Sequence, residues 1–244
     1  MSDTIQVQRE GAIATVVLNR PTKLNALTRD MWLGLGAAIE RLSSDDGLRC
    51  IILRGAGERA FSPGNDIGEF ATARANKAQA IEYGRVMHDA AHALAACPIP
   101  LVAQIHGICV GGGLEIAALC DLRICGESSR FGAPIKNLGL VMAYPEMAPL
   151  VRIAGVAVAL EILLEGRVFD AAEAKAKGLV KRLRRAKPVG HAAKDLLRAA
   201  QLPLLPSDEA HVDDDLKVGQ RLRKGFAHIA EHRVELVGRR RRLL

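Results

Sequence analysis

The sequence predicts an α/β fold followed by a helical C-terminal region. Short β-branched stretches alternate with apolar-periodic stretches of helical length up to about residue 125, a pattern typical of an α/β core. Glycine-rich loops follow several of the predicted strands. From residue 146 onward strand patterns almost disappear, apart from residues 179–183, and helical patterns continue to residue 244.

The first predicted unit is a strand, a turn and a helix. Residues 13–18 (IATVVL) are rich in β-branched side chains, and Pro21 lies shortly after them, where it stops a sheet ladder. Thr28 is a suitable N-cap for the helix that follows. The apolar residues of that helix recur at helical spacing: Met31, Leu35, Ile39 and Leu42.

The next elements repeat this alternation. Strands are predicted at residues 50–53, 101–105 and 122–125, from short apolar runs bounded by glycine or proline. A loop covers residues 61–66, a helix ends near Pro98, and another helix runs from three glycines at 111–113 to Leu119. No repeat or low-complexity linker divides the 244 residues. We therefore predict one domain, with a core at residues 1–190 and a helical C-terminal region at 191–244.

Charge is distributed unevenly along the chain. Residues 181–244 hold 16 Lys or Arg and 8 Asp or Glu, whereas residues 1–180 hold 18 and 19. This basic region is either a solvated helical face with a charged tail or a surface for a polyanionic partner. Nucleic acid is not the expected partner: Arg239 to Arg242 could contact phosphates, but five Phe, two Tyr and one Trp are too few for base stacking.

The cysteines and the N-terminus predict a soluble cytoplasmic protein. The five cysteines are an odd number in apolar surroundings without a C-x-x-C pair, which favours reduced thiols over disulfides or metal ligands. We expect no metal site. The first residues lack a basic stretch followed by an apolar one, and the longest uncharged segment, 90–114, is broken by prolines and glycines. No membrane span is expected.

Two glycine-containing loops are candidate oxygen-binding sites. The glycines at 111–113 precede an apolar helix and leave backbone N–H groups unpaired at its positive end, with Glu115 about one turn further on. Gly64 can adopt a positive φ that turns the N–H of Asn65 into a pocket. Two such donors on one oxygen would form an oxyanion hole. Tight helix packing and an ordinary surface turn are the alternative explanations.

Other glycine-based chemistries fit the sequence less well. A dinucleotide-binding fingerprint would need glycine at position 116, which is Ile116. Ser62 loosely imitates a hydrolase nucleophile, but the following residue, Pro63, has no N–H to donate to an oxyanion.

Five segments in order resemble the crotonase superfamily, the enoyl-CoA hydratases and isomerases. They are LNRPTKLNAL (18–27), AFSPGNDIGEF (60–70), HGICVGGGLEIAALCDLRI (106–124), FGAPIKNLGL (131–140) and FDAAEAKAKGLV (169–180). The resemblance implies a spiral of ββα units and a homotrimer or dimer of trimers. It also implies an acyl-CoA thioester as partner, so that coenzyme A is part of the substrate and no cofactor is permanently bound.

The resemblance also assigns residues. The thioester oxygen would lie between the backbone N–H groups of Asn65 and Gly112, and the CoA moiety would pass along Lys23, Leu24 and Ala26. Such a site suits enolate chemistry in general rather than one reaction.

Hydratases of this family use two glutamates. Glu115 matches the first, but Ile135 stands where the second is usual and cannot transfer a proton. We expect an enoyl-CoA hydratase-like enzyme with a single catalytic glutamate; the alternatives are a Δ3-Δ2 enoyl-CoA isomerase, an acyl-CoA decarboxylase, or a thioester-binding protein with weak or no activity.

Ile135, Met142, Tyr144 and Glu146 are candidates for the substrate pocket. Glu146 is also explained as an acid at a helix N-terminus.

Overall fold

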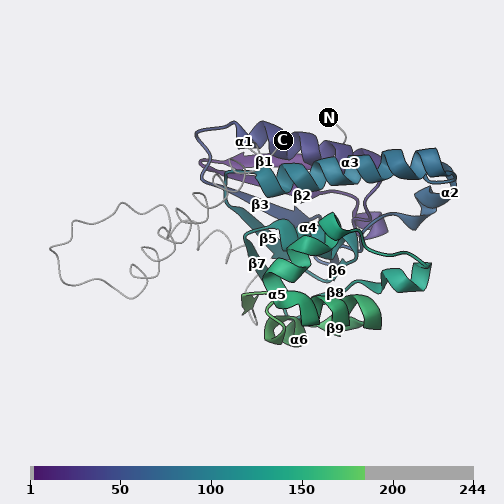
Figure 1. The fold of residues 1–244 in the computed structure, drawn as a ribbon. Coiled ribbons are helices and arrows are strands. Elements are labelled where there is room, and N and C mark those ends of the chain that lie inside the picture. Colours follow the sequence, from purple (N-terminus) through teal and green to yellow (C-terminus); the bar gives the residue numbers. More distant parts are fainter. Residues whose placement is uncertain (1–2, 185–244) are drawn as a thin grey trace, which may run out of the picture.

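The computed structural model describes residues 3–184, which form two sheets with helices packed around them (Figure 1). The first sheet has six strands in the order β1-β2-β3-β5-β7-β10. The β1–β2 pair is antiparallel and the remaining pairs are parallel. Its strands are β1 (Ile5–Glu10), β2 (Ile13–Leu18), β3 (Cys50–Gly55), β5 (Leu101–Ile105), β7 (Leu122–Gly126) and β10 (Arg182–Arg184).

The second sheet has four short strands in the order β4-β6-β8-β9, with only β8 and β9 antiparallel. They are β4 (Ala60–Ser62), β6 (Ile108–Val110), β8 (Arg130–Gly132) and β9 (Val168–Asp170). From β3 onward, each of three successive turns of the chain adds one strand to each sheet (β3 and β4, β5 and β6, β7 and β8) before the chain returns through helices. The helices are α1 (Arg29–Ser43), α2 (Phe70–Ala73), α3 (Lys77–Ala96), α4 (Gly112–Leu119), α5 (Tyr144–Glu165) and α6 (Ala171–Ala176). The predicted α/β fold with ββα units is confirmed.

Most of the predicted longer elements are confirmed. The strands at 13–18 and 101–105 have the predicted bounds, and those at 50–53 and 122–125 are slightly longer than predicted. Thr28 is the N-cap of α1, and its hydroxyl accepts from the N–H of Met31 at 3.2 Å. The predicted strand at 179–183 is wrong in its position, because β10 begins only at Arg182. The carbonyl oxygen of Leu179 instead accepts a side-chain hydrogen bond from Arg123 at 2.6 Å.

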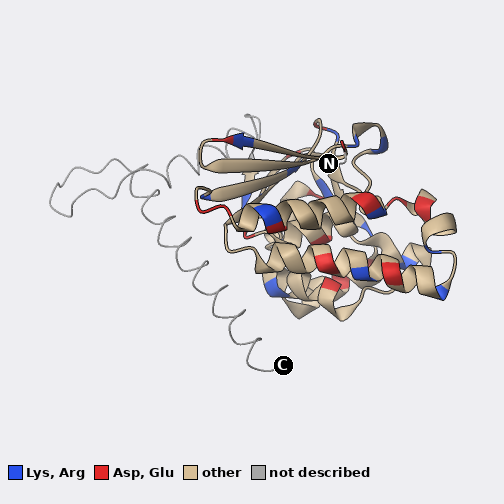
Figure 2. Cartoon of the chain, turned by 90° about the horizontal axis from the view of Figure 1, so that it is seen from above, with Lys and Arg blue, Asp and Glu red and all other residues tan. Residues whose placement is uncertain are grey.

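The main core lies between the first sheet and the α1–α3 pair. Trp32 and Leu35 of α1 and Tyr83 of α3 are almost completely buried in it. The two helices approach closely where a Cβ on Gly36 would lie 3.3 Å from the Cα of Ala90. Acidic and basic residues are both spread over the described part of the chain, as expected for an almost neutral body (Figure 2). The predicted C-terminal region at 191–244, with Arg239 to Arg242, lies outside the described residues.

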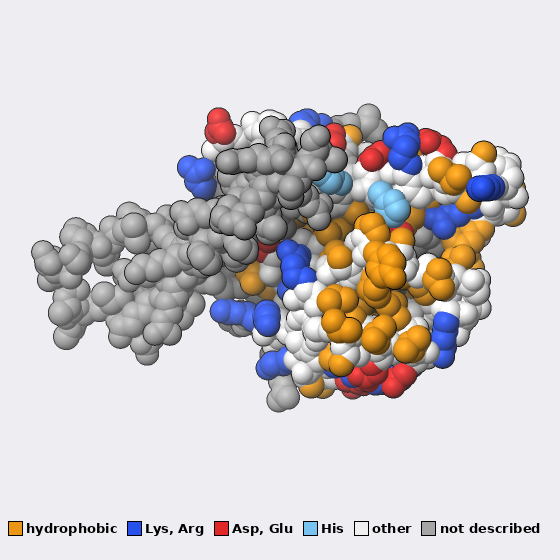
Figure 3. Space-filling model, viewed as in Figure 1, with side chains coloured by type: hydrophobic (Ala, Val, Ile, Leu, Met, Phe, Trp, Pro, Cys, Tyr) orange, Lys and Arg blue, Asp and Glu red, His pale blue; other side chains and the backbone are white. Residues whose placement is uncertain are grey.

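Helix α5 is unusually apolar and largely uncovered in the described structure. It is long and apolar enough to cross a membrane by length and composition, although core helices of soluble proteins can meet the same criterion. Gly155, at φ +81°, interrupts the helix. Val156, Leu160 and Leu164 are 60%, 43% and 70% exposed, and Figure 3 shows hydrophobic side chains gathered on this side. A patch of this kind usually marks a contact surface.

Candidate active site

Two glycine-containing turns bring the backbone amides of Asn65 and Gly112 together. Gly64 has a φ of +95°, and a Cβ added there would lie 2.6 Å from the Gly112 nitrogen. A Cβ on Gly112 would lie 3.8 Å from the Asn65 nitrogen. Among residues 3–184, neither of the two N–H groups has a hydrogen-bond acceptor. Two free donors this close to each other can hold a single oxygen atom.

The turn that carries Asn65 is held in place by buried hydrogen bonds. The Ser62 hydroxyl donates to the Asn25 carbonyl oxygen at 2.9 Å and accepts from the Gly64 N–H at 3.1 Å. The Asn25 side-chain amide donates to the Ala60 carbonyl oxygen at 2.8 Å. Because the Ser62 hydroxyl is buried and its proton is already donated, this serine supports the turn and is not a free nucleophile.

Trp32 fixes the side chain of Asn65. Its indole N–H donates to Asn65 Oδ1 at 2.7 Å, and the ring is fully buried. A Cβ on Gly112 would lie 3.3 Å from Trp32 Cζ2, so the ring lies against both turns. Sequence reasoning missed Trp32 and the linking role of Asn25. A tryptophan on an apolar helix face is ordinarily a core residue, and no local pattern reveals its hydrogen-bond partner.

Glu115 is a buried carboxyl group with one unpartnered oxygen. It lies in the first turn of α4, three residues after Gly112, so the two residues share one helix face. The residue is 6% exposed, and Oε1 has no hydrogen-bond partner in the described part of the chain. Burial, and next the charge of Glu146, raises the pKa of Glu115 to about 8. A group with such a pKa is available in both protonation states near neutral pH.

Glu146 lies in the first turn of α5, the helix that packs beside α4. Its Oε2 accepts from the Ala143 N–H at 3.1 Å, which caps the helix, and its Oε1 lies 3.3 Å from His88 Nε2. The predicted role as an acid at a helix N-terminus is therefore seen directly. The same carboxylate is close enough to Glu115 to raise its pKa.

The predicted CoA-binding segment lies beside the Asn65 turn. The Leu27 N–H donates to the Gly64 carbonyl oxygen at 2.8 Å, and this bond places the preceding residues along the same edge. Lys23 is exposed, Leu24 is half-buried with a φ of +54°, and Ala26 is buried. Of these three residues, only Lys23 presents an exposed cation of the kind that could meet a phosphate.

The remaining predicted pocket residues differ in their burial. Ile135 is half-buried in the short 3-10 helix Pro134–Leu138, and Met142 is half-buried against the main core. Tyr144 is 84% exposed at the start of α5, so its hydroxyl is not enclosed with Glu115 in the described structure. Ile135 brings no proton-transferring group, which leaves Glu115 as the one buried carboxyl group among the described residues.

The described residues show no other reactive centre. No group of three His, Cys, Asp or Glu side chains within residues 3–184 is arranged to hold a metal ion. The five cysteines are free thiols and all are buried, as the prediction of reduced thiols requires. Burial raises the pKa of Cys125 to about 11, so this sulfur is not a thiolate at neutral pH.

Comparison with known sequences places the motifs in one family. The enoyl-CoA hydratase/isomerase family model matches residues 8–204. The probable enoyl-CoA hydratase of Mycobacterium avium is 40% identical over 172 residues, which cover 70% of this chain and 65% of that protein. The short-chain-enoyl-CoA hydratase of Clostridium acetobutylicum is 30% identical over 194 residues, covering 80% and 74%. This chain thus spans 65% of the length of the mycobacterial relative.

Solved structures agree with the sequence matches. An enoyl-CoA hydratase/carnithine racemase from Magnetospirillum magneticum has a TM-score of 0.79 and 52% identity, covering 84% of this chain and 77% of that one. An enoyl-CoA hydratase from Bacillus anthracis has a TM-score of 0.75 and 27% identity, covering 93% and 92%. The crotonase-like fold predicted from the motifs is confirmed by these neighbours.

Proposed function

Because this chain belongs to the enoyl-CoA hydratase/isomerase family, we propose that it hydrates a 2-enoyl-CoA thioester with Glu115 as its single catalytic carboxyl group. One observation carries the proposal: a buried carboxyl group with a free oxygen lies on the same helix face as one of two free, adjacent amides. The chain supplies a place for developing negative charge and, beside it, a group that can exchange a proton.

The two amides act on the thioester carbonyl. As a nucleophile adds to the β-carbon, electrons move onto the carbonyl oxygen, where the N–H groups of Asn65 and Gly112 stabilise the enolate. Each such donor typically contributes about 2.7–4 kcal/mol to transition-state stabilisation. Because Trp32 and Ser62 hold the Asn65 turn rigidly, the donors need little reorganisation during the reaction.

Glu115 acts first as general base and then as general acid. As a carboxylate it takes a proton from the attacking water, whose oxygen bonds to the β-carbon. As the resulting acid it returns a proton to the α-carbon, so that one water molecule is added across the double bond and the carboxylate is restored. The raised pKa suits this double role, because neither protonation state is strongly favoured near neutral pH.

Ile135 supports a second candidate within the family. A Δ3-Δ2 isomerisation or a decarboxylation needs the enolate site but not two water-holding carboxylates, and this chain lacks the second one at the usual position. In an isomerisation Glu115 would remove a proton from C2 of a 3-enoyl-CoA and return it at C4. A thioester-binding protein with weak or no activity is the third outcome.

One assay separates these functions. Crotonyl-CoA and a 3-enoyl-CoA are incubated with the protein, and the conjugated thioester is followed by its absorbance, which falls on hydration and rises on isomerisation. Glu115→Gln is expected to reduce the rate by about 100- to 10,000-fold. The control Glu82→Gln removes an exposed carboxylate of α3 and should leave the rate unchanged. Undiminished activity in Glu115→Gln would overturn the assignment, and thermal stabilisation by thioesters without turnover would favour the binding protein.

A homotrimer or dimer of trimers is proposed for the assembly, with acyl-CoA as ligand and no permanently bound cofactor. The exposed apolar side chains of α5 support a contact between copies (Figure 3). Leu164→Glu should lower the mass measured by light scattering, whereas Ile81→Glu, at a similarly exposed residue of α3, should not. A wild-type monomer would contradict the proposal.

A further inference from the structure

The guanidinium of Arg74, which follows α2, is half-buried and has no oxygen acceptor within residues 3–184. It stacks over the rings of Tyr83 and Phe70, with its carbon 3.9 and 4.7 Å from their centroids. Its Nε is buried without a hydrogen-bond partner, and no carboxylate within residues 3–184 forms an ion pair with it. A buried donor without an acceptor is costly, so the arrangement points to an acceptor that is not part of the described chain.

Met87 connects this guanidinium to the candidate active site. Its sulfur lies 2.9 Å from Arg74 Nη2 and 3.6 Å from Asn65 Nδ2. A single sulfur atom thus separates Arg74 from the residue whose backbone N–H is proposed to hold the thioester oxygen. Sulfur is a weak acceptor for a guanidinium, which binds the two oxygens of a carboxylate far better.

The acidic side chain that contacts Tyr83 is already engaged elsewhere. Glu69 Oε2 accepts from the Tyr83 hydroxyl at 3.1 Å and from the Arg29 N–H at 2.8 Å. It fixes the tyrosine ring against which Arg74 stacks, but it is not the ion-pair partner of Arg74. The aromatic rings therefore hold the guanidinium in place and leave its positive charge for another group.

We propose that Arg74 binds a carboxylate at the far end of the acyl chain, so that the preferred ligands are CoA thioesters of short dicarboxylic acids. The inference rests on the proposed function for the position of the thioester carbonyl. The Asn65 side chain and the Arg74 guanidinium both contact Met87, and the acyl chain would run past this methionine. The planar fork of Arg74 would then form a charge-assisted pair with both terminal oxygens.

Binding of two matched, unreactive thioesters tests this inference. Glutaryl-CoA and pentanoyl-CoA both have five-carbon acyl chains, but only the first ends in a carboxylate. By isothermal titration calorimetry the wild type should bind glutaryl-CoA at least about tenfold more tightly. Arg74→Met should weaken glutaryl-CoA binding to the level of pentanoyl-CoA and leave the latter within about twofold. Arg85→Met, which removes an exposed arginine of α3, should keep the preference.

The outcomes separate the two proposals. Equal wild-type affinities, or a preference that survives in Arg74→Met, would overturn the role of Arg74 while leaving the proposed function intact. If neither thioester binds, the thioester site and the Arg74 subsite both fail. A preference that depends on Arg74, in a protein without hydratase or isomerase activity, would support the subsite and contradict only the chemistry. Arg74→Lys keeps the charge and tests the same dependence should Arg74→Met fail to fold; it should retain part of the preference, and an unchanged preference would count against bidentate binding.

Discussion

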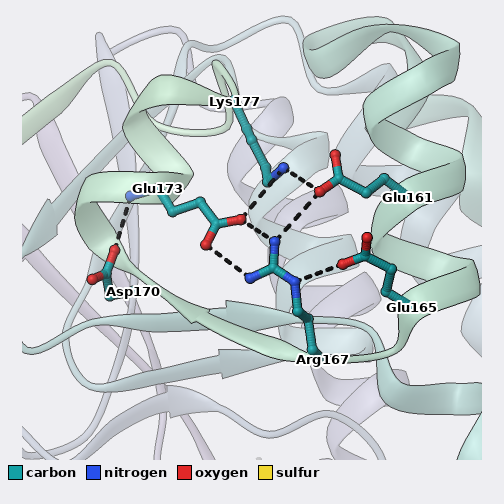
Figure 4. Close-up of polar contacts among 6 residues, drawn as sticks. All are labelled: Glu161, Glu165, Arg167, Asp170, Glu173 and Lys177. Carbon is teal, nitrogen blue, oxygen red and sulfur yellow. Dashed lines mark hydrogen bonds and ion pairs between the residues drawn. The ribbon is translucent and has the colours of Figure 1, made fainter.

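Glu115 of α4 and the ion-paired carboxylates of α5 and α6 lie in opposite electrostatic surroundings. The ion-pair cluster consists of Glu161, Glu165, Arg167, Glu173 and Lys177 (Figure 4). Arg167 binds Glu165 at 2.6 Å and also pairs with Glu173, while Lys177 binds Glu161 at 2.6 Å. Glu115 lies deep in the fold and one of its oxygens has no partner in the described residues.

The two surroundings shift the pKa values of their carboxyl groups in opposite directions. Hydrogen bonds from Lys177 and Arg167 lower the pKa of Glu161 and of Glu173, respectively, whereas burial raises the pKa of Glu115 to about 8. The lowered pKa favours the ionised form of Glu161 and Glu173, which suits ion pairs that join α5 to α6. Glu115 can change its protonation state near neutral pH. In this fold the unpaired, buried carboxyl group marks the candidate for proton transfer, and the dense group of charges does not.

The largest expected effect is a pH-dependent loss of folding stability caused by the buried carboxyl group of Glu115. In the unfolded chain this carboxyl group titrates near 4.5, and in the fold near 8, so the native state binds the extra proton between these values. Wild-type stability should therefore be fully present below about pH 4.5 and fall as the pH rises to 8, by at most about 4–5 kcal/mol. Glu115→Gln removes this dependence, which urea denaturation across the pH range measures.

Glu173→Gln is the control from the ion-pair cluster. The pH dependence that Glu173 gives to stability has the opposite sign to that of Glu115. Because the pKa of Glu173 is lowered in the fold, its contribution is present above its unfolded value and is lost as the pH falls through the folded one. The two variants should therefore diverge from the wild type in different pH ranges. A wild-type minus Glu115→Gln difference that stays constant between pH 5 and 8 would show that Glu115 is not buried without a partner.

The next largest effect is expected where Gly64 meets Gly112. An alanine Cβ at Gly64 would lie 2.6 Å from the Gly112 nitrogen, beside the proposed oxygen site, so Gly64→Ala should lower kcat by about 100- to 1,000-fold. Gly57→Ala is a matched control, because Gly57 also has a positive φ but no atom within 4 Å of the added Cβ. It carries the strain of an alanine at a positive φ without the collision. Equal losses in both variants would assign the effect to strain alone.

The sequence predicts the strands that carry a local pattern of side chains. The strands at 13–18 and 101–105 are buried β-branched or apolar runs, and their burial follows from composition. The four strands of the second sheet have only three residues each and exist because distant segments pair. No local periodicity can be recognised in three residues. The β10 error has the same origin, since the Arg123 bond to Leu179 joins residues 56 positions apart.

The residues of the candidate site likewise fall into those that a local motif predicts and those that only the folded structure reveals. Asn65, Gly112 and Glu115 belong to glycine-containing motifs with a characteristic order, so the sequence identifies them. Trp32 and Arg74 owe their roles to tertiary contacts with Asn65 and Met87, and neither carries a local signal. Burial without a partner, which distinguishes Glu115 from the ion-pair cluster, is likewise a property of the folded chain.

A smaller effect is expected at Glu146. Glu146→Gln keeps an oxygen to accept from the Ala143 N–H but removes the negative charge that raises the pKa of Glu115. The apparent pKa assigned to Glu115 in the pH profile of kcat/KM should move downward while remaining above the usual range, because burial is the larger cause. Glu165→Gln removes a charge from the other end of the same helix and should not move it. An unshifted profile in Glu146→Gln would rule out electrostatic coupling between the two glutamates.

The smallest effect is expected in the ion-pair cluster itself. Arg167→Met removes ion pairs that join α5 to α6, but these side chains are substantially exposed and screened by water and salt. The variant should have a slightly lower Tm, a smaller deficit at high salt, and an unchanged kcat/KM. Arg85→Met is the control, because within residues 3–184 the ion pairs of Arg85 are with Glu82 and Asp89 of its own helix.

Arg167→Met should be the more destabilising of the two arginine variants, since it disconnects two elements rather than loosening one helix. Its deficit should also shrink as the pH falls below the ordinary range of glutamate, where the carboxylates lose their charge in both variant and wild type. The deficit linked to Glu115 lies at the opposite, high-pH end of the range. A change in kcat/KM in Arg167→Met, with Tm unchanged, would couple the ion-pair cluster to the active site and abolish the separation between the two regions.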